Sequence, residues 1–217
     1  MTGWALPEAS DGSVNMAGHE GGLLPVLEGL LPVGGVFIDI GAHMGLWTIR
    51  LGARASKVIA VEPSPDTAEI LRQNITLNGL GGKVEVLEAA AWDSGEPLTL
   101  ENPTGRADTM SGLMRLVPDS YGPIRGTRLD DALPPLDRID LVKVDTEGAD
   151  IRALTGMARL IGQHRPVLFV ECHHMLPYCD YTLDDLEGFI TGIGYGYEME
   201  RWATQEHLLC KPRMADA

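Results

Sequence analysis

The stretch from Val36 to Gly45, VFIDIGAHMG, constrains the fold of this chain more than any other. Apolar and β-favouring residues lead into Asp39, and Gly41 and Gly45 then open a turn before the apolar run from Leu46 to Leu51. This order predicts a strand, a glycine turn and the start of a helix. Backbone N–H groups at such a helix N-terminus favour a carboxylate or a phosphate. The glycine spacing differs from the G-x-G-x-x-G fingerprint of dinucleotide-binding folds, so it disfavours a dehydrogenase.

Apolar runs and helical patterns alternate along the rest of the chain. After Val36, further strands are expected at Lys57–Val61, Val84–Leu87, Asp140–Val144, Pro166–Val170, Tyr195–Glu200 and His207–Lys211. Helices are expected at Leu23–Leu31, from Leu46, at Ser64–Asn78, at Gly148–Ile161 and at Thr182–Thr191, where Ser64 and Thr182 would be the cap residues. This alternation predicts an α/β fold with a Rossmann-like, doubly wound, seven-stranded and mostly parallel sheet. The last two strands are expected to close it as an antiparallel pair.

The domain organisation is expected to be simple, because 217 residues suit one α/β domain. Residues 1–20 are rich in small and acidic residues without a period, so we expect a flexible arm or a lid, and residues 21–217 are expected to form a single domain. Residues 93–138 interrupt the α/β rhythm. Only Leu98–Leu100 reads as a strand there, and so long a segment indicates a functional region or an inserted hairpin.

The composition excludes several classes of partner. There are 17 Lys and Arg residues against 31 Asp and Glu residues, which gives a net charge of −14 and disfavours nucleic acid and acidic membranes as partners. The odd number of cysteines, three, fits a reducing compartment. No export signal and no run of about 20 apolar residues is seen, so a cytoplasmic protein is expected. Oligomeric state is left open, and a homodimer is one of the alternatives.

Carboxylates stand at the end of five predicted strands. In doubly wound sheets ligands bind beyond the carboxyl ends of the strands, so these residues point to one site. The alternative is that they cap the helices that follow. They are Asp39, Glu62, Glu88, Asp145 and Glu171.

The second strand end suits a nucleoside. Glu62 follows Asp39 by 23 positions, and a carboxylate there can accept hydrogen bonds from vicinal ribose hydroxyls. Gly41 and Gly45 would let the backbone approach a charged tail, although they can also be plain turn glycines. The small side chains and exposed backbone at Glu88–Ala90 suit a flat adenine edge.

At this point the chain resembles a known family, the FkbM-type S-adenosylmethionine-dependent methyltransferases of the class I fold. The matching motifs run in the family's order from Val36 to about Glu171: FIDIGAHMG, VIAVEPSPDTAEILRQNITLNGL, VEVLEAAAWD, TRLDDAL, IDLVKVDTEGADIRALTGM and RPVLFVE. The resemblance implies that residues 21–217 are a methyltransferase domain. It also implies that the methionine part of the cofactor lies over Gly41–Gly45, with ribose on Glu62 and adenine beside Glu88–Ala90. The cofactor-binding residues predicted in this way are Asp39, Gly41, Ala42, His43, Gly45, Glu62, Pro63, Ser64, Glu88, Ala89, Ala90 and Asp145.

The resemblance also implies O-methylation, often in secondary metabolism, with a small-molecule hydroxyl of a sugar, nucleoside or other metabolite as acceptor. A hydroxyl needs a base, and the favoured one is His173, which follows the strand end at Glu171 by two residues; Asp145 and Glu171 complete the predicted catalytic set. His43 is the second choice, and Glu147 and His174 are further candidates. Two alternatives stay open: an N-methyltransferase, which needs less of a base, and a non-catalytic S-adenosylmethionine-binding module.

A metal is not predicted. Asp145, Glu147 and Glu171 have the oxygen ligands that suit a divalent cation, but they can equally fix the turn into the next helix. Cys172, His173, His174 and Cys179 are zinc-ligand types. Adjacent residues at a strand end cannot all converge on one ion, so a zinc site is disfavoured.

Overall fold

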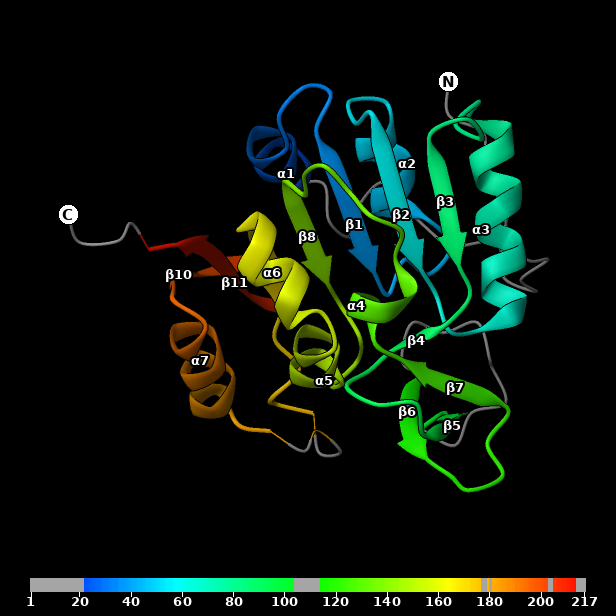
Figure 1. Ribbon diagram of the computed structural model, residues 1–217, viewed down its shortest axis with the longest axis vertical. Helices are drawn as coiled ribbons and strands as arrows, with labels where there is room; N and C mark the ends of the chain where they lie inside the picture. The colour runs from blue at the N-terminus through cyan, green and yellow to red at the C-terminus, as the bar shows by residue number, and fades with distance from the viewer. Residues whose placement is uncertain (1–21, 104–113, 177–178, 180, 203–204, 214–217) are drawn as a thin grey trace.

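The main sheet of the protein has seven strands in the order β10-β11-β9-β8-β1-β2-β3 (Figure 1). The computed structural model describes residues 22–103, 114–176, 179, 181–202 and 205–213, so the predicted arm at residues 1–20 lies outside the described residues. The strands are β1 (Val36–Ile40), β2 (Lys57–Val61), β3 (Val84–Leu87), β8 (Leu141–Val144), β9 (Val167–Glu171), β10 (Tyr195–Trp202) and β11 (Gln205–Pro212). The first five pair in parallel, and β11 is antiparallel to both β9 and β10. The predicted Rossmann-like sheet with an antiparallel C-terminal strand is therefore confirmed.

Helices cover both faces of this sheet. Successive side chains of a strand point to opposite faces, so a strand that is apolar throughout needs a helix layer on each face to bury them. On one face, Phe37 of β1 packs with α1 (Leu24–Leu30) and α2 (Leu46–Gly52), and α3 (Pro65–Leu77) packs nearby against Ala60 of β2. On the other face, Ile38 and Ile40 pack with α5 (Asp150–Thr155), α6 (Ala158–His164) and α7 (Leu183–Gly192). The carboxyl ends of β1, β2, β3 and β8 all point the same way in Figure 1.

A second, small sheet lies beyond these strand ends (Figure 1). Its order is β4-β7-β5-β6, with β4 (Ala90–Ala91), β7 (Ile124–Thr127), β5 (Pro97–Glu101) and β6 (Arg115–Pro118). The strand expected at Leu98–Leu100 is confirmed as part of β5, which pairs antiparallel with β6. The described parts of the segment from 93 to 138 thus include three of the strands of this small sheet, which lies over the strand ends of the main sheet.

The predicted single helix over Gly148–Ile161 is wrong, because the chain forms α5 and α6 with a break between them. At Gly156 an added Cβ would lie 2.0 Å from the backbone oxygen of Trp92, so the turn packs tightly there. The carboxylate of Asp130, in α4 (Leu129–Ala132), accepts hydrogen bonds at 2.9 Å from the backbone N–H groups of Arg159 and Leu160. Asp130 therefore caps the N-terminus of α6 from a distant part of the chain, and a new helix begins there.

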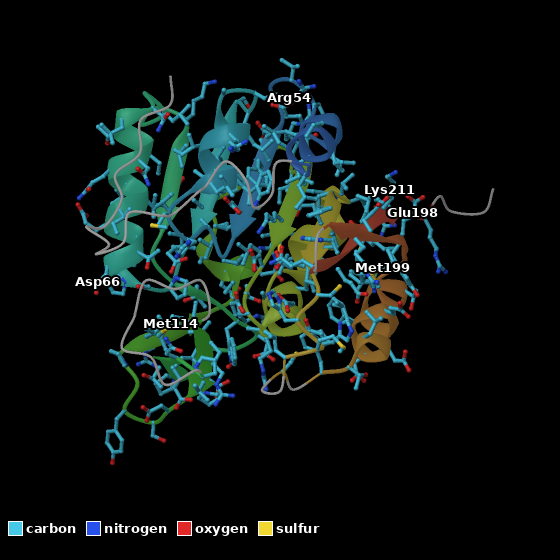
Figure 2. All side chains as sticks on the ribbon, turned by 180° about the vertical axis from the view of Figure 1, so that it is seen from behind. Arg54, Asp66, Met114, Glu198, Met199 and Lys211 are labelled. Carbon is cyan, nitrogen blue, oxygen red and sulfur yellow. The ribbon has the colours of Figure 1, made fainter. Side chains whose placement is uncertain are left out.

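The two predicted helix caps are confirmed. Ser64 accepts a hydrogen bond from the backbone N–H of Thr67, and Thr182 forms a reciprocal capping box with Asp185. The edge of the sheet formed by β10 and β11 carries exposed side chains, among them Glu198, Met199 and Lys211 (Figure 2). Within the described ranges, no helix is both long enough and apolar enough to cross a membrane.

Candidate functional site

The turn after β1 lies between the ends of β2 and β8. The backbone N–H groups of Gly41 and Ala42 donate to the carbonyl of Val61 at 3.0 Å, and the N–H of Asp145 donates to the carbonyl of Ile40 at 3.0 Å. Gly41 has φ +79°, and a Cβ at this position would lie 1.8 Å from the backbone oxygen of Asp145. Glycine is required at position 41 both by the backbone conformation and by this approach.

Glu62 is held in the turn by two backbone N–H groups. Its Oε2 accepts from His43 and its Oε1 accepts from Ser64, both at 2.9 Å. Burial raises the pKa of Glu62 to about 7, although the two hydrogen bonds act in the opposite direction. Since a carboxylate has about four acceptor positions, the oriented group keeps capacity for two hydroxyl donors. Vicinal ribose hydroxyls match that capacity.

The structure places the other residues of the predicted cofactor set around this turn. Asp39 is buried, and its Oδ2 accepts from the hydroxyl of Thr48 at 2.6 Å, while burial raises its pKa. Ala42 is also buried, and Gly45 has φ +97° at the N-cap of α2. Pro63 lies between Glu62 and Ser64 in the link to α3. Contact of these residues with a cofactor stays a prediction.

The end of β3 lies beside Glu62. The backbone N–H of Ala89 donates to the carbonyl of Glu62 at 3.2 Å. Glu88 forms an exposed ion pair with Arg72 at 2.8 Å, whereas Ala90 is buried in β4. The backbone of residues 88–89 is therefore close to the proposed ribose carboxylate, and the adenine role of this segment stays a prediction.

His173 is buried among carboxylates beyond the ends of β8 and β9, of which Asp145 and Glu147 are partly exposed. Its Nδ1 is 3.2 Å from Oδ2 of Asp150. Its Nε2 is 3.5 Å from Oδ1 of Asp145, 3.8 Å from Oε2 of Glu147 and 3.8 Å from Oε1 of Glu171. Burial by itself lowers the pKa of His173, but the charge of Asp150, helped by Asp145 and Glu147, raises this pKa to about 10. With this pKa the imidazole is protonated at neutral pH, and a protonated imidazole cannot accept a proton. The assignment of His173 as general base stays a prediction.

Asp150 and Tyr181 were missed by the sequence reasoning. The carboxylate of Asp150 is fully buried and accepts hydrogen bonds from the hydroxyl of Tyr181 at 2.5 Å and from the hydroxyl of Thr146 at 2.7 Å. Burial raises the pKa of Asp150, but His173 and these donors lower it below its ordinary value. The only local signal was an acidic residue in the first turn of a helix, which does not distinguish a buried site residue from an exposed cap.

Lys143 is a second site residue without a local signal. It lies inside β8, is buried, and its Nζ is 2.8 Å from Oδ2 of Asp145. Burial raises the pKa of Asp145, but Lys143 and His173 lower it below its ordinary value. Asp145 is therefore ionised at neutral pH.

Glu147 belongs to the cluster of carboxylates around His173 and also lines a cleft. It has φ +52°, and burial raises the pKa of its carboxyl to about 8. The cleft has a volume of about 210 Å³ and lies between β6 and the segment that leads into α5. It is lined by Trp92, Arg115–Pro118, Glu147–Ala149 and Arg152.

The structure also shows where the residues with metal-ligand side chains lie. Asp145, Glu171 and His173 each offer one ligand atom, and these three atoms all lie within 4.8 Å of one another. In the part of the chain that the structure describes, no cysteine joins this group, and burial raises the pKa of the Cys172 thiol to about 12. His174 points elsewhere, with its Nε2 3.7 Å from Glu206. The residue set does not fit zinc bound through cysteine.

Comparison with known proteins gives consistent matches. The Methyltransferase FkbM domain matches residues 39–199, which is more than half of the chain. Methyltransferase sdnD of Sordaria araneosa is 27% identical over 164 residues, covering 58% of this chain and 62% of that protein. Methyltransferase 1 of Beauveria bassiana is 28% identical over 144 residues, covering 55% and 57%. The chain thus spans about 60% of the length of these curated relatives.

Solved structures show the same fold. The structure of Methyltransferase FkbM from Methylobacillus flagellatus KT has a TM-score of 0.57 at 22% identity, covering 83% of this chain and 45% of that one. A putative rRNA-methylase from Clostridium thermocellum has a TM-score of 0.60 at 9% identity, covering 92% and 97%. At these identities the likeness concerns the fold alone. The match of the family domain over residues 39–199 shows that the chain belongs to the FkbM methyltransferase family.

Proposed function

We propose that this chain is an S-adenosylmethionine-dependent O-methyltransferase that acts on a hydroxyl of a small molecule, such as a sugar, a nucleoside or another secondary metabolite. The family membership and the two relatives named as methyltransferases support methyl transfer. The net charge of −14 supports a small acceptor over a polyanion. The observation that carries the hydroxyl assignment is the position of Glu147 in the wall of the cleft.

The residues of the β1 and β2 strand ends fit the cofactor. Glu62 is oriented by two backbone N–H groups and keeps free acceptor positions for ribose hydroxyls. Gly41, which carries no side chain, packs directly against the backbone of Asp145, and the turn that it forms is where the methionine part would lie. When bound, S-adenosylmethionine supplies a methyl group that its sulfonium already activates for transfer.

The protein's own task is then to orient the acceptor and take its proton. A hydroxyl oxygen is a weak nucleophile until its proton is removed, so it needs a base within hydrogen-bond reach, whereas a neutral amine can attack before it loses a proton. Glu147 is the acidic residue that lines the cleft, while His173 is 6% exposed and directs its Nε2 at carboxylates. Glu147 is therefore our choice as general base, and the cleft wall formed by β6 and Trp92 would exclude water from the acceptor.

The test is methyl transfer to a panel of hydroxylated sugars and metabolites, followed by mass spectrometry for the gain of one methyl group. Replacing Glu147 by Gln should lower kcat on the accepted substrate about 100-fold or more, with unchanged affinity for S-adenosylmethionine. The exposed Glu198, on β10, offers a matched control, and Glu198→Gln should keep the full rate. Full activity of Glu147→Gln, or methylation found only on amines, would contradict the proposal.

A further inference from the structure

Three side chains from two neighbouring strand ends meet beyond β8 and β9. They are Asp145, Glu171 and His173, and one ligand atom of each lies within 4.8 Å of the other two. Glu171 and His173 are 4% and 6% exposed. Two ligands that are each about 2.1 Å from one metal ion can be at most about 4.2 Å apart. The observed separations of Nε2 of His173 from the two carboxylates, 3.5 and 3.8 Å, fall within that limit.

Nε2 of His173 is directed at these oxygens without a hydrogen bond of normal length. The distances to Asp145 and Glu171 exceed the range of an N–H···O bond, which ends near 3.2 Å. Nδ1 of the same ring is 3.2 Å from the carboxylate of Asp150. A carboxylate behind one ring nitrogen fixes the orientation of the other, which is the usual arrangement of a histidine that binds a metal.

In each of the two carboxylates, one oxygen faces His173 and the other oxygen lies next to a different side chain. Asp145 directs Oδ1 toward His173, while its Oδ2 is held by Lys143 Nζ at 2.8 Å. Glu171 directs Oε1 toward His173, while its Oε2 is 3.5 Å from Nε2 of His207. Each of the three side chains thus presents one atom to a common point, with its other atom next to a buried partner. This pattern distinguishes the group from an exposed acidic cluster.

From this geometry we propose that Asp145, Glu171 and His173 bind one divalent first-row transition-metal cation, and that Mn²⁺ suits the site. One imidazole nitrogen with carboxylate oxygens is a mixed donor set that Mn²⁺ accepts, and the cysteines that would select zinc are absent from the group. The cation would displace the proton on Nε2 of His173, which is released to solvent. The site lies next to Glu147, whose Oε2 is 3.8 Å from Nε2 of His173. If the proposed function holds, the cation would bind the acceptor hydroxyl and lower its pKa before Glu147 removes the proton.

The test measures metal binding to the full chain without cofactor or acceptor, so that its failure is separate from a failure of methyl transfer. The protein is freed of metal with EDTA and desalted, and MnCl₂ is titrated while electron paramagnetic resonance follows the free ion. We expect one Mn²⁺ per chain. Asp145→Asn and Glu171→Gln should each weaken binding about 10-fold or more, while Glu198→Gln should bind as the unchanged protein does.

A second readout does not depend on the variants being folded. Co²⁺ bound to the unchanged protein should shift the ring N–H signal of His173 far outside the normal proton range, because Nδ1–H remains next to Asp150. A folded protein that binds no Mn²⁺ or Co²⁺ up to about 1 mM would overturn the proposal. Unchanged Mn²⁺ affinity in both folded carboxylate variants would overturn it as well.

Discussion

His43 and Glu147 hold an uncommon backbone conformation at the two turns that form the candidate site. Their φ angles are +50° and +52°, and Arg165 at the end of α6 is the third non-glycine residue with positive φ in the described ranges. A left-handed conformation costs about 1–2 kcal/mol for such a residue. At His43 the conformation accompanies the backbone N–H bond to Glu62, and at Glu147 it accompanies the approach of the carboxylate to His173. Strain of this kind is concentrated at functional sites.

Gly41 and Gly79 provide a matched pair for testing the packing of the glycine turn. Both have positive φ, but a Cβ at Gly41 would meet the backbone of Asp145 at 1.8 Å, while one at Gly79 would meet nothing within 4 Å. We expect Gly79→Ala to lower the free energy of unfolding by about 1–2 kcal/mol, from the backbone conformation alone. Gly41→Ala should lower it clearly more, because the Asp145 backbone must move. Urea unfolding of both variants checks this, and equal losses would show that the turn is not tightly packed.

Among single residues, the sequence predicted positions at strand ends where a local rule applied. Asp39, Glu62 and Glu171 were found because each ends an apolar run, and the structure places all three at strand ends. Lys143 and Asp150 were missed because their role depends on contacts across the fold. The Asp150 carboxylate meets His173 and Tyr181, which lie 23 and 31 positions away along the chain.

Among the secondary-structure elements, the strands of the main sheet were predicted from the sequence and most of the short strands of the small sheet were not. The strands β1, β2, β8 and β9 are buried on both faces and read as mostly apolar runs, whereas β3 at the edge of the sheet exposes Glu85. The bounds of all five parallel strands were predicted within a few residues. The strands β4, β6 and β7 were not predicted. They have two to four residues each, and β6 and β7 mix charged and apolar side chains without a clear period.

The break between α5 and α6 could not be predicted from periodicity, because the apolar stripe from Ile151 to Ile161 continues across it. What begins the second helix is the carboxylate of Asp130, about 30 positions earlier in the chain. Local patterns contain no information on such a distant cap.

The cap on α6 can be tested with neighbouring aspartates. Asp130→Ala removes two hydrogen bonds to backbone N–H groups and should lower the free energy of unfolding by about 1–3 kcal/mol. The side chain of Asp131 is 74% exposed, so Asp131→Ala should change it by less than about 0.5 kcal/mol. Thermal or urea unfolding measures both. Equal effects would mean that Asp130 does not hold the start of α6.

At the scale of the whole molecule, the order of the strands brings residues from distant segments to one edge. The ends of β1 and β2 carry Glu62 and the glycine turn, while the ends of β8 and β9 carry Asp145 and Glu171. The small sheet stands over these ends and supplies one wall of the cleft beside Glu147 (Figure 1). The proposed cofactor half and the proposed acceptor half of the site therefore lie at one edge of the sheet, as an in-line group transfer requires.

We propose that S-adenosylmethionine binds at the β1 and β2 strand ends with its ribose on an ionised Glu62. The pKa of Glu62 is raised to about 7, and a bound ribose would form charge-assisted hydrogen bonds with the ionised form only. A proton on Glu62 thus competes with the cofactor, so affinity is lost as the pH falls through about 7. Between about pH 8 and about pH 6 this group should weaken binding about tenfold.

The most direct measurement is calorimetric titration with S-adenosylmethionine at both pH values, on the unchanged protein and on Glu62→Gln, with circular dichroism to confirm folding. When the pH is lowered from about 8 to about 6, the affinity of the unchanged protein should fall about tenfold more than the affinity of Glu62→Gln. The variant should also bind more weakly by about 1–3 kcal/mol at the higher pH. An unchanged affinity in a folded Glu62→Gln protein, or no heat of binding with S-adenosylmethionine at either pH, would contradict the account.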